Sequence, residues 1–218
     1  MQEQIGRKDV RLVRKNLQLP DRSLEVWYKQ YDYPPGSWRY AWRISKARRE
    51  YLSYAHMMRL GVQCATPVAC GEERDSLRRL RRAFIVTVSI PDAKPLVVFV
   101  KANHPGRDAR ESILRDLARM TRKAHDGGFI HRDLWVRNVL VNWQSPTKPA
   151  VWWIDSPKGA VWRWLARFGK TLDLASLNKG AAGFSTRSER LRFLKEYLGE
   201  SQNGELKRLA RKVQKMRM

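Results

Sequence analysis

Cysteine is scarce in this chain of 218 residues, which contains only Cys64 and Cys70. The two are too close together and too few to indicate a disulfide framework, and no histidine cluster accompanies them to complete a zinc site. We therefore interpret both as reduced, packed thiols of a cytosolic protein.

Long apolar runs are also missing. No stretch approaches the roughly 20 apolar residues that span a bilayer, and the N-terminal MQEQIGRKDV lacks the apolar core of a signal peptide. We expect a soluble or membrane-peripheral protein. A hydrophobic content of 43% is enough for the core of one ordinary domain or of two small lobes sharing a cleft.

Acidic residues are few relative to basic ones. The chain has 44 Lys and Arg against 21 Asp and Glu, a formal net charge of +23. Such a field attracts nucleic acids, anionic membranes or phosphorylated substrates, and charge alone does not choose among them.

Aromatic and basic residues alternate in two segments, YDYPPGSWRYAWRISKARR and GAVWRWLARFGK. This composition favours contact with an anionic membrane surface. The alternative is that Trp162, Trp164 and Phe168 fill the core while the arginines are solvated. The C-terminal ELKRLARKVQKMRM predicts a basic helix that either adds to this surface or caps the domain.

Periodicity and turn residues predict the main elements. Residues 9–31 form a hairpin around LPDRS, and 45–61 form a helix that ends at Gly61. Two further strands, PVACGEE and RRAFIVTVSI, precede an amphipathic helix, DARESILRDLARMTRKAHDGG. A second hairpin, VLVNW with AVWWID, follows, and the chain beyond about 171 is mostly helical. The order predicts an α+β protein with a small antiparallel-sheet lobe at 1–92 and a mainly helical lobe at 93–218, which together make one domain.

The segment FIHRDLWVRNVLV places ionisable groups between runs that would otherwise form a buried strand. His131, Asp133 and Asn138 have the spacing H-R-D-L-x-x-x-N, and an apolar strand ends in Asp155 seventeen residues after Asn138. This spacing matches the catalytic loop and metal aspartate of protein-kinase-like phosphotransferases. It predicts a protein-kinase-like two-lobe fold.

The chemistry of that reaction explains the residue types. Asn138 and Asp155 supply the hard oxygen ligands that Mg²⁺ prefers when it carries ATP. Asp133 accepts a hydrogen bond from the acceptor hydroxyl and directs its oxygen at the γ-phosphorus. For His131 we prefer a packed, hydrogen-bonded support of the catalytic loop over a general base.

A kinase-like site also requires a lysine on a strand of the small lobe and a glutamate on the next helix. Lys29 in VWYKQY and Glu50 in RREYL meet this order. Lys29 would neutralise the α- and β-phosphates, and Glu50 would hold its ammonium group by an ion pair. Val88 and Ile90, at the end of the last strand of the small lobe, are predicted to contact the nucleotide.

These residues resemble those of the bacterial lipopolysaccharide kinases, which phosphorylate heptose or Kdo sugars of the inner core. The similarity covers most of the chain, through VWYKQYDYP, HRDLWVRNVLV, WWIDSPKG, LDLASLNKGA and SERLRFLKEYLG. It implies an ATP-dependent sugar kinase at the cytoplasmic face of the inner membrane, with the inner-core glycolipid as substrate. It also implies that Asp173 braces the catalytic loop, although a carboxylate at a helix N-terminus is an equal alternative.

Two motifs of protein kinases are missing. No G-x-G-x-x-G loop precedes Lys29, and D-S-P stands where D-F-G would be. We therefore expect the first strand of the small lobe to be absent, abbreviated or lost to a misplaced start. Other functions are therefore kept: a protein or small-molecule kinase, a pseudokinase that binds a partner without catalysis, or a basic nucleic-acid-binding protein. No nucleic-acid motif supports the last, and we expect no specific nucleic-acid partner.

Overall fold

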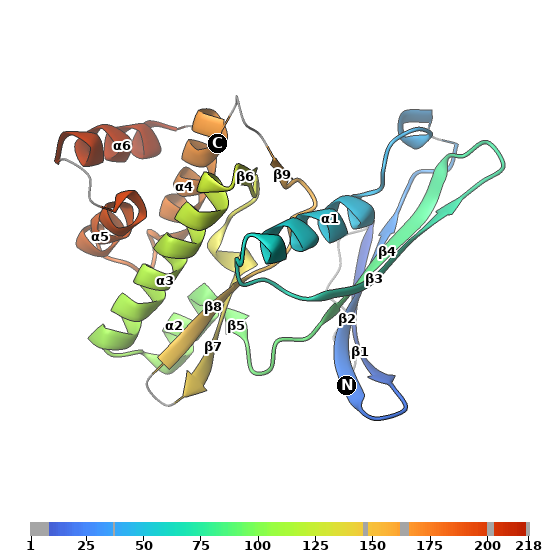
Figure 1. Ribbon diagram of the computed structural model, residues 1–218, viewed down its shortest axis with the longest axis horizontal. Helices are drawn as coiled ribbons and strands as arrows, with labels where there is room; N and C mark the ends of the chain where they lie inside the picture. The colour runs from blue at the N-terminus through green and yellow to red at the C-terminus, as the bar shows by residue number, and fades with distance from the viewer. Residues whose placement is uncertain (1–8, 37, 146–147, 162–165, 200–202, 217–218) are drawn as a thin grey trace. The chain divides into compact units, whose positions relative to one another are not determined.

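The computed structural model describes residues 9–36, 38–145, 148–161, 166–199 and 203–216. This part of the chain divides into two compact units (Figure 1). The first unit comprises the described residues of 1–56, 65–90 and 156–158. The second comprises those of 57–64, 91–155 and 159–218.

The first unit contains one antiparallel sheet. Its four strands are β1 (Val10–Gln18), β2 (Ser23–Asp32), β3 (Pro67–Arg74) and β4 (Leu80–Val88), in the order β1-β2-β4-β3. The predicted N-terminal hairpin is confirmed, because β1 pairs along its whole length with β2. Its turn closes at LPDRS, where the N–H of Leu19 donates to the carbonyl of Arg22 at 2.8 Å. Both later strands are also confirmed.

Helix α1 (Lys46–Arg59) confirms the helix predicted between the two hairpins. The side-chain oxygen of Ser45 accepts a hydrogen bond from the N–H of Arg48 at 3.0 Å, which caps the first turn. The chain leaves the helix at Gly61, whose φ of +63° lies in the left-handed region that glycine tolerates. Ala47, Glu50 and Tyr54 are buried at positions i, i+3 and i+7, so a carboxylate lies on the buried face of this helix.

The second unit is mainly helical. Its helices are α2 (Leu96–Asn103), α3 (Arg107–Asp126), α4 (Ala166–Ala181), α5 (Arg187–Leu198) and α6 (Asn203–Lys215). Helices α3, α4, α5 and α6 share a core that consists of Ala118, Leu174, Ala175, Leu194, Tyr197 and Val213. Because Val213 of α6 is buried there, with Leu206 and Leu209 packed against it, the basic C-terminal helix covers this core. Helix α2 was not predicted.

The predicted second hairpin is present as β7 (Val139–Ser145) and β8 (Lys148–Trp153), which pair antiparallel. A two-residue strand, β5 (Lys94–Pro95), extends it to a three-stranded sheet. The similarly short β6 (Phe129–Ile130) pairs with β9 (Ala160–Val161). The fully buried Trp153 anchors the end of β8, two residues before Asp155.

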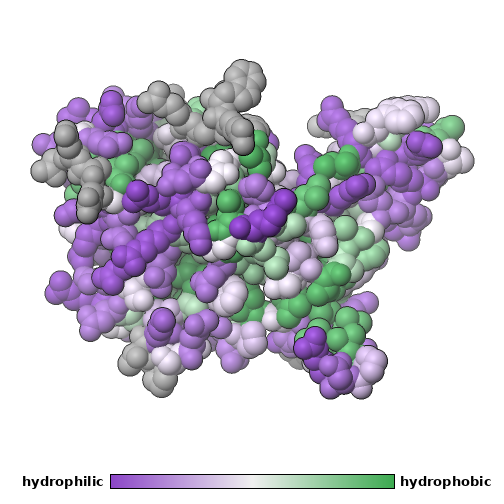
Figure 2. All heavy atoms as spheres, in the orientation of Figure 1, coloured by the Kyte–Doolittle hydropathy of each residue, from purple (hydrophilic) through white to green (hydrophobic). Residues whose placement is uncertain are grey.

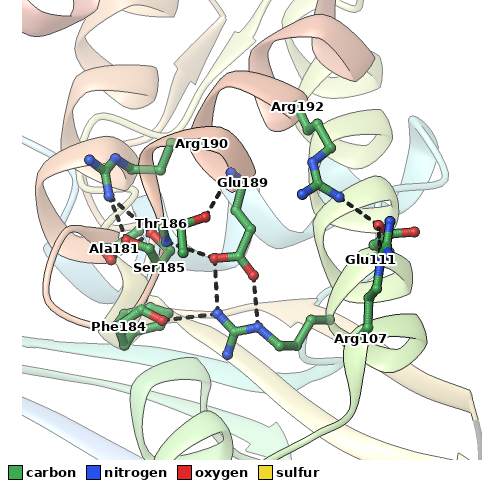
Figure 3. A network of polar contacts seen from close by, with 10 residues as sticks. Arg107, Glu111, Ala181, Phe184, Ser185, Thr186, Glu189, Arg190 and Arg192 are labelled. Atoms are coloured by element: carbon green, nitrogen blue, oxygen red, sulfur yellow. Dashed lines mark hydrogen bonds and ion pairs between the residues drawn. The ribbon is translucent and has the colours of Figure 1, made fainter.

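Helix α5 begins with a capping box and with an ion pair to helix α3 (Figure 3). The Thr186 hydroxyl accepts from the N–H of Glu189, and the Glu189 carboxylate accepts from the N–H of Thr186. Arg110 of α3 adds a two-pronged ion pair to Glu189, at 2.7 and 3.1 Å, and also donates to the carbonyl of Phe184 at 3.0 Å. These contacts fix the start of α5 to α3.

The surface of the α3 and α5 region is strongly hydrophilic (Figure 2). None of the described helices is long and apolar enough to cross a membrane. Cys64 and Cys70 are reduced thiols, and burial raises the pKa of Cys64 to about 12. Of the aromatic residues in GAVWRWLARFGK, Trp162 and Trp164 lie outside the described residues, and Phe168 is exposed rather than part of the core.

Candidate active site

Lys29 and Glu50 form an ion pair inside the first unit. The Lys29 ammonium lies 3.3 and 3.2 Å from the two carboxylate oxygens of Glu50, whose side chain is only 3% exposed. The hydroxyls of Tyr31 and Tyr54 also donate to this carboxylate, at 2.6 and 3.3 Å. A buried carboxylate with this many donors has its charge compensated, and it holds the lysine on β2 in a fixed place.

Val88 and Ile90 are also in this unit, where β4 ends. Both are half-buried, and the N–H of Val88 donates to the carbonyl of Thr66 at 2.8 Å. In the sheet register Val88 lies opposite Val26 of β2, three residues before Lys29. The end of β4 is thus anchored to the strand that carries the lysine.

The second unit contains the predicted catalytic loop, between β6 and β7. A hydrogen bond within the loop holds its two ends together: the Asn138 side-chain amide donates to the carbonyl of Asp133 at 2.8 Å. A 3-10 turn, η2 (Val136–Asn138), precedes β7. Because the amide nitrogen of Asn138 is engaged in this way, its side-chain oxygen is the atom that remains for a ligand.

Asp155 is held beside this loop by the hairpin. The N–H of Ile154 donates to the carbonyl of Asn138 at 3.0 Å, which places the residue preceding Asp155 against Asn138. Asp155 has a φ of +59°, which is uncommon for a residue other than glycine. Arg132, in the loop itself, has a φ of +63°. Left-handed conformations of this kind persist where surrounding contacts impose them, and they cluster at functional sites.

Asp173 of α4 supplies those contacts for the loop. Its fully buried carboxylate accepts hydrogen bonds from the backbone N–H groups of His131 and Arg132, each at 2.8 Å. The carboxylate therefore fixes the two residues that precede Asp133. This geometry favours the loop-bracing interpretation over a helix-terminal carboxylate, since Asp173 lies in the middle of α4.

Two glycines let α4 approach the loop closely. A Cβ atom at Gly169 would lie 2.9 Å from side-chain carbons of Ile130, and one at Gly180 would lie 2.9 Å from a methyl of Val136. Both neighbours are β-branched and have little rotamer freedom to move aside. The absence of a side chain at both glycines allows α4 to pack against the segment on either side of Asp133.

His131 ties the loop to the strand that leads to Asp155. Its Nε2 lies 3.2 Å from the carbonyl of Ile154, and its ring meets that of Trp153 edge-on at 5.5 Å. Burial lowers the pKa of His131, although the nearby carboxylate of Asp173 opposes this shift. A neutral ring that donates through Nε2 suits a structural support.

Several contributors to this site were missed from the sequence. His125 of α3 contacts Asp173 through Nε2 at 3.3 Å, and the hydroxyl of Tyr197 of α5 lies 2.9 Å from the other ring nitrogen of His125. Within the loop, the guanidinium of Arg137 lies 3.5 Å from Asp133 and over the ring of Trp135. The position of Arg137 within the H-R-D-L-x-x-x-N segment could have indicated its contact with Asp133. No local pattern marked His125 or Tyr197.

The predicted residues thus form two groups. Lys29 and Glu50 meet in the first unit, while the loop, Asp155 and Asp173 meet in the second. Among the described residues no cluster of three or more His, Cys, Asp or Glu could enclose a metal ion. Asn138 and Asp155 nevertheless fit Mg²⁺, because this ion takes one or two protein oxygens and completes its shell with phosphate oxygens and water.

The fold is that of protein-kinase-like enzymes, as predicted. The solved structure "WaaP in complex with acyl carrier protein" matches this chain with a TM-score of 0.71 and 23% sequence identity, covering 98% of this chain and 88% of that one. The sequence profile of the Lipopolysaccharide kinase (Kdo/WaaP) family matches residues 22–197. The chain therefore belongs to this family, as the sequence motifs predicted.

Two curated relatives align over parts of the chain. The 3-deoxy-D-manno-octulosonic acid kinase of Vibrio cholerae serotype O1 is 26% identical over 121 residues, which is 56% of this chain and 47% of that protein. The lipopolysaccharide core heptose(I) kinase WaaP of Pseudomonas aeruginosa is 27% identical over 158 residues, 69% of this chain and 59% of that protein. The chain spans about half the length of these relatives.

Proposed function

We propose that this protein is an ATP- and Mg²⁺-dependent kinase that transfers the γ-phosphate to a heptose or Kdo hydroxyl of the lipopolysaccharide inner core. The observation that carries this proposal is that Asp155 is held beside the loop of Asp133 and Asn138, in a chain of the lipopolysaccharide kinase family. Both curated relatives are kinases that act on such sugars by name, one on Kdo and one on heptose.

In this proposal Asp133 accepts the proton of the acceptor hydroxyl. The hydroxyl oxygen then forms a bond to the γ-phosphorus while the bond from that phosphorus to the bridging oxygen of ADP breaks. Lys29, positioned by Glu50, neutralises the α- and β-phosphates, and Val88 and Ile90 contact the adenine end. Positioning and neutralisation of charge are most of what phosphoryl transfer requires of a protein.

Asn138 and Asp155 would hold Mg²⁺ through oxygen atoms, and the bound ion would screen the phosphate charge. His131 and Asp173 would touch neither substrate. Their role is to fix the loop backbone so that Asp133 and Asn138 face the reacting groups. The acceptor is anchored in lipid, so we place the protein in the cytoplasm, peripherally on the inner membrane, where an anionic surface would meet its net charge of +23.

The test incubates the purified protein with labelled ATP and lipopolysaccharide acceptors that carry or lack Kdo and heptose. Mass spectrometry then locates any new phosphate on the glycan. We expect transfer that requires Mg²⁺, that depends on one of the two sugars, and that falls below detection in Asp133→Asn. Asp108→Asn, an exposed carboxylate at the start of α3, is the control and keeps full activity.

Other outcomes identify the alternatives. ATP binding with no transfer to any glycan would show a pseudokinase or a kinase with a protein or small-molecule acceptor, and would sink the sugar-kinase proposal. Salt-sensitive binding of RNA or DNA, with neither ATP binding nor transfer, would favour a nucleic-acid-binding protein.

A further inference from the structure

Two loops of the first unit bring exposed aromatic and basic side chains together. Trp38 and Trp42, in and after the 3-10 turn η1 (Trp38–Tyr40), are 63% and 80% exposed. Leu77, in the turn between β3 and β4, is 49% exposed. In Figure 2 the surface at the position of η1 is pale, which marks intermediate hydropathy, and it lies beside hydrophilic side chains of the same unit. Exposed indoles and an exposed leucine that gather at loop tips indicate an interaction site.

Arginines accompany the indoles directly. The guanidinium of Arg79 lies 5.3 Å from the centre of the Trp38 ring, and that of Arg78 lies 6.0 Å from the Trp42 ring. Arg43, next to Trp42 in the first loop, is exposed. We call the group Trp38, Trp42, Leu77, Arg43, Arg78 and Arg79 the indole–arginine patch.

Arg74 fastens the two loops into one platform. Its guanidinium donates to the carbonyls of Ala41 and Arg43 in the first loop, at 3.0 and 2.9 Å, and to that of Arg78 in the second, at 2.8 Å. A surface that is already ordered loses little conformational entropy when it binds. The hydrogen bonds of Arg74 therefore preorganise the patch for binding.

The carboxylate nearest the patch is committed to the turn itself. Asp75 accepts from the N–H groups of Leu77 and Arg79, at 3.1 and 2.9 Å, and its other oxygen pairs with the Arg79 guanidinium at 2.8 Å. Its side chain is only 9% exposed. Asp75 therefore shapes the tip, and its small exposed area leaves the outward face of the patch to cationic and apolar groups.

We propose that the indole–arginine patch is a docking surface for an anionic phospholipid membrane. Indole rings settle at the boundary between headgroups and acyl chains, and guanidinium groups beside them pair with lipid phosphates. Leu77 adds an aliphatic side chain, which gains from contact with hydrocarbon and has no stacking role with a nucleic-acid base. The choice of a lipid partner rests on the proposed function, since a lipid-anchored acceptor is met at a membrane.

The experiment measures partitioning onto vesicles of phosphatidylethanolamine and phosphatidylglycerol, with phosphatidylcholine vesicles as the uncharged comparison. Wild-type protein is expected to bind the anionic vesicles, and Trp38→Ser/Trp42→Ser to bind them at least tenfold more weakly. Arg43→Gln/Arg78→Gln is expected to weaken binding roughly 30-fold, because each arginine near an anionic surface contributes roughly fivefold in affinity and the two effects multiply.

Arg115→Gln/Arg119→Gln, which removes two exposed arginines from α3, is the charge-matched control. Binding of this control within threefold of wild type supports the proposal. Equal losses in the two double-arginine variants would mean that net charge acts without a specific face, and would overturn it. Binding of Trp38→Ser/Trp42→Ser to anionic vesicles as tight as that of wild type would also overturn the proposal. Tighter binding of the patch to RNA than to vesicles would overturn it too.

Phosphate transfer to a delipidated core oligosaccharide separates this proposal from the proposed function. Both patch variants are expected to keep wild-type activity on this acceptor, because the patch is remote in sequence from the catalytic loop and touches no group assigned to catalysis. If no acceptor is phosphorylated yet vesicle binding still depends on the patch, the kinase proposal fails and the docking surface stands. Loss of activity on the delipidated acceptor in the tryptophan variant would overturn the assignment of the patch to docking alone.

Discussion

The buried carboxylate of Asp173 accepts the backbone N–H of His131 at 2.8 Å, 42 residues earlier in the chain. This single contact joins the middle of α4 to the segment that carries the proposed catalytic aspartate. Because the second oxygen of Asp173 takes the N–H of Arg132, the loop backbone is held at two consecutive residues. The left-handed φ of Arg132 is maintained by this pair of bonds.

Asp173→Asn is predicted to disable the loop. One of the two oxygens becomes an NH₂ group that faces backbone donors, so a buried N–H loses its acceptor at a cost of about 1 to 3 kcal/mol. Displacement of Asp133 by about 1 Å is expected to lower kcat roughly 100-fold. Steady-state kinetics and thermal unfolding measure the two effects. Full activity in this variant would show that the loop does not depend on Asp173.

Tyr197→Phe tests the outer part of the same chain of contacts. Without the hydroxyl, Nδ1 of the buried His125 loses its partner, and we expect the free energy of unfolding to fall by about 1 to 2 kcal/mol. Because Asp173 still holds the loop directly, kcat should change less than about threefold. The partly exposed Tyr51 gives the control, Tyr51→Phe, with stability within about 0.5 kcal/mol of wild type.

Sequence reasoning predicted the parts of the candidate site that have short, ordered motifs. The spacing of His131, Asp133 and Asn138 and the strand that ends at Asp155 are local patterns, and the Lys29–Glu50 pair followed from the order of elements in the kinase-like fold. His125 and Tyr197 are 72 residues apart in the chain, on different helices, and meet only after packing. Nothing in their neighbouring residues distinguishes them from ordinary core positions.

Helix α2 shows a different limit. LVVFVKAN is rich in β-branched residues, which favour strands, so propensity points away from a helix. The structure buries Leu96, Phe99 and Val100, which share one helical face at i, i+3 and i+4. Tertiary burial of that face outweighs local preference, and a window of eight residues is too short for the helical period to be recognised.

Lys29→Met is predicted to weaken use of ATP. It removes the cation proposed to neutralise the α- and β-phosphates, so kcat/KM for ATP should fall roughly 100-fold or more. Glu50→Gln should also lower kcat/KM, because the lysine loses the charge that positions it, while the amide oxygen still accepts from Tyr31. The control is Lys15→Met on β1, an exposed strand lysine with no assigned role. Equal kinetics in Lys29→Met and Lys15→Met would remove Lys29 from the nucleotide site.

The ion pair between Arg110 and Glu189 predicts a pH-dependent contribution to stability. Hydrogen bonding to Arg110 lowers the pKa of Glu189 from about 4.5 to about 2. A carboxyl whose pKa is lower when folded stabilises the protein above pH 4.5 and loses that effect as the pH falls towards 2. Arg110→Met should therefore cost about 1 to 2 kcal/mol of unfolding free energy at neutral pH, and the gap to wild type should narrow below pH 4.5. Denaturant unfolding across this pH range measures the difference in unfolding free energy.

The control is Arg107→Met, which removes the exposed partner of Glu111 and should show little cost at any pH. A gap for Arg110→Met that stays constant with pH would mean that packing, and not the charge of Glu189, stabilises the junction of α3 and α5.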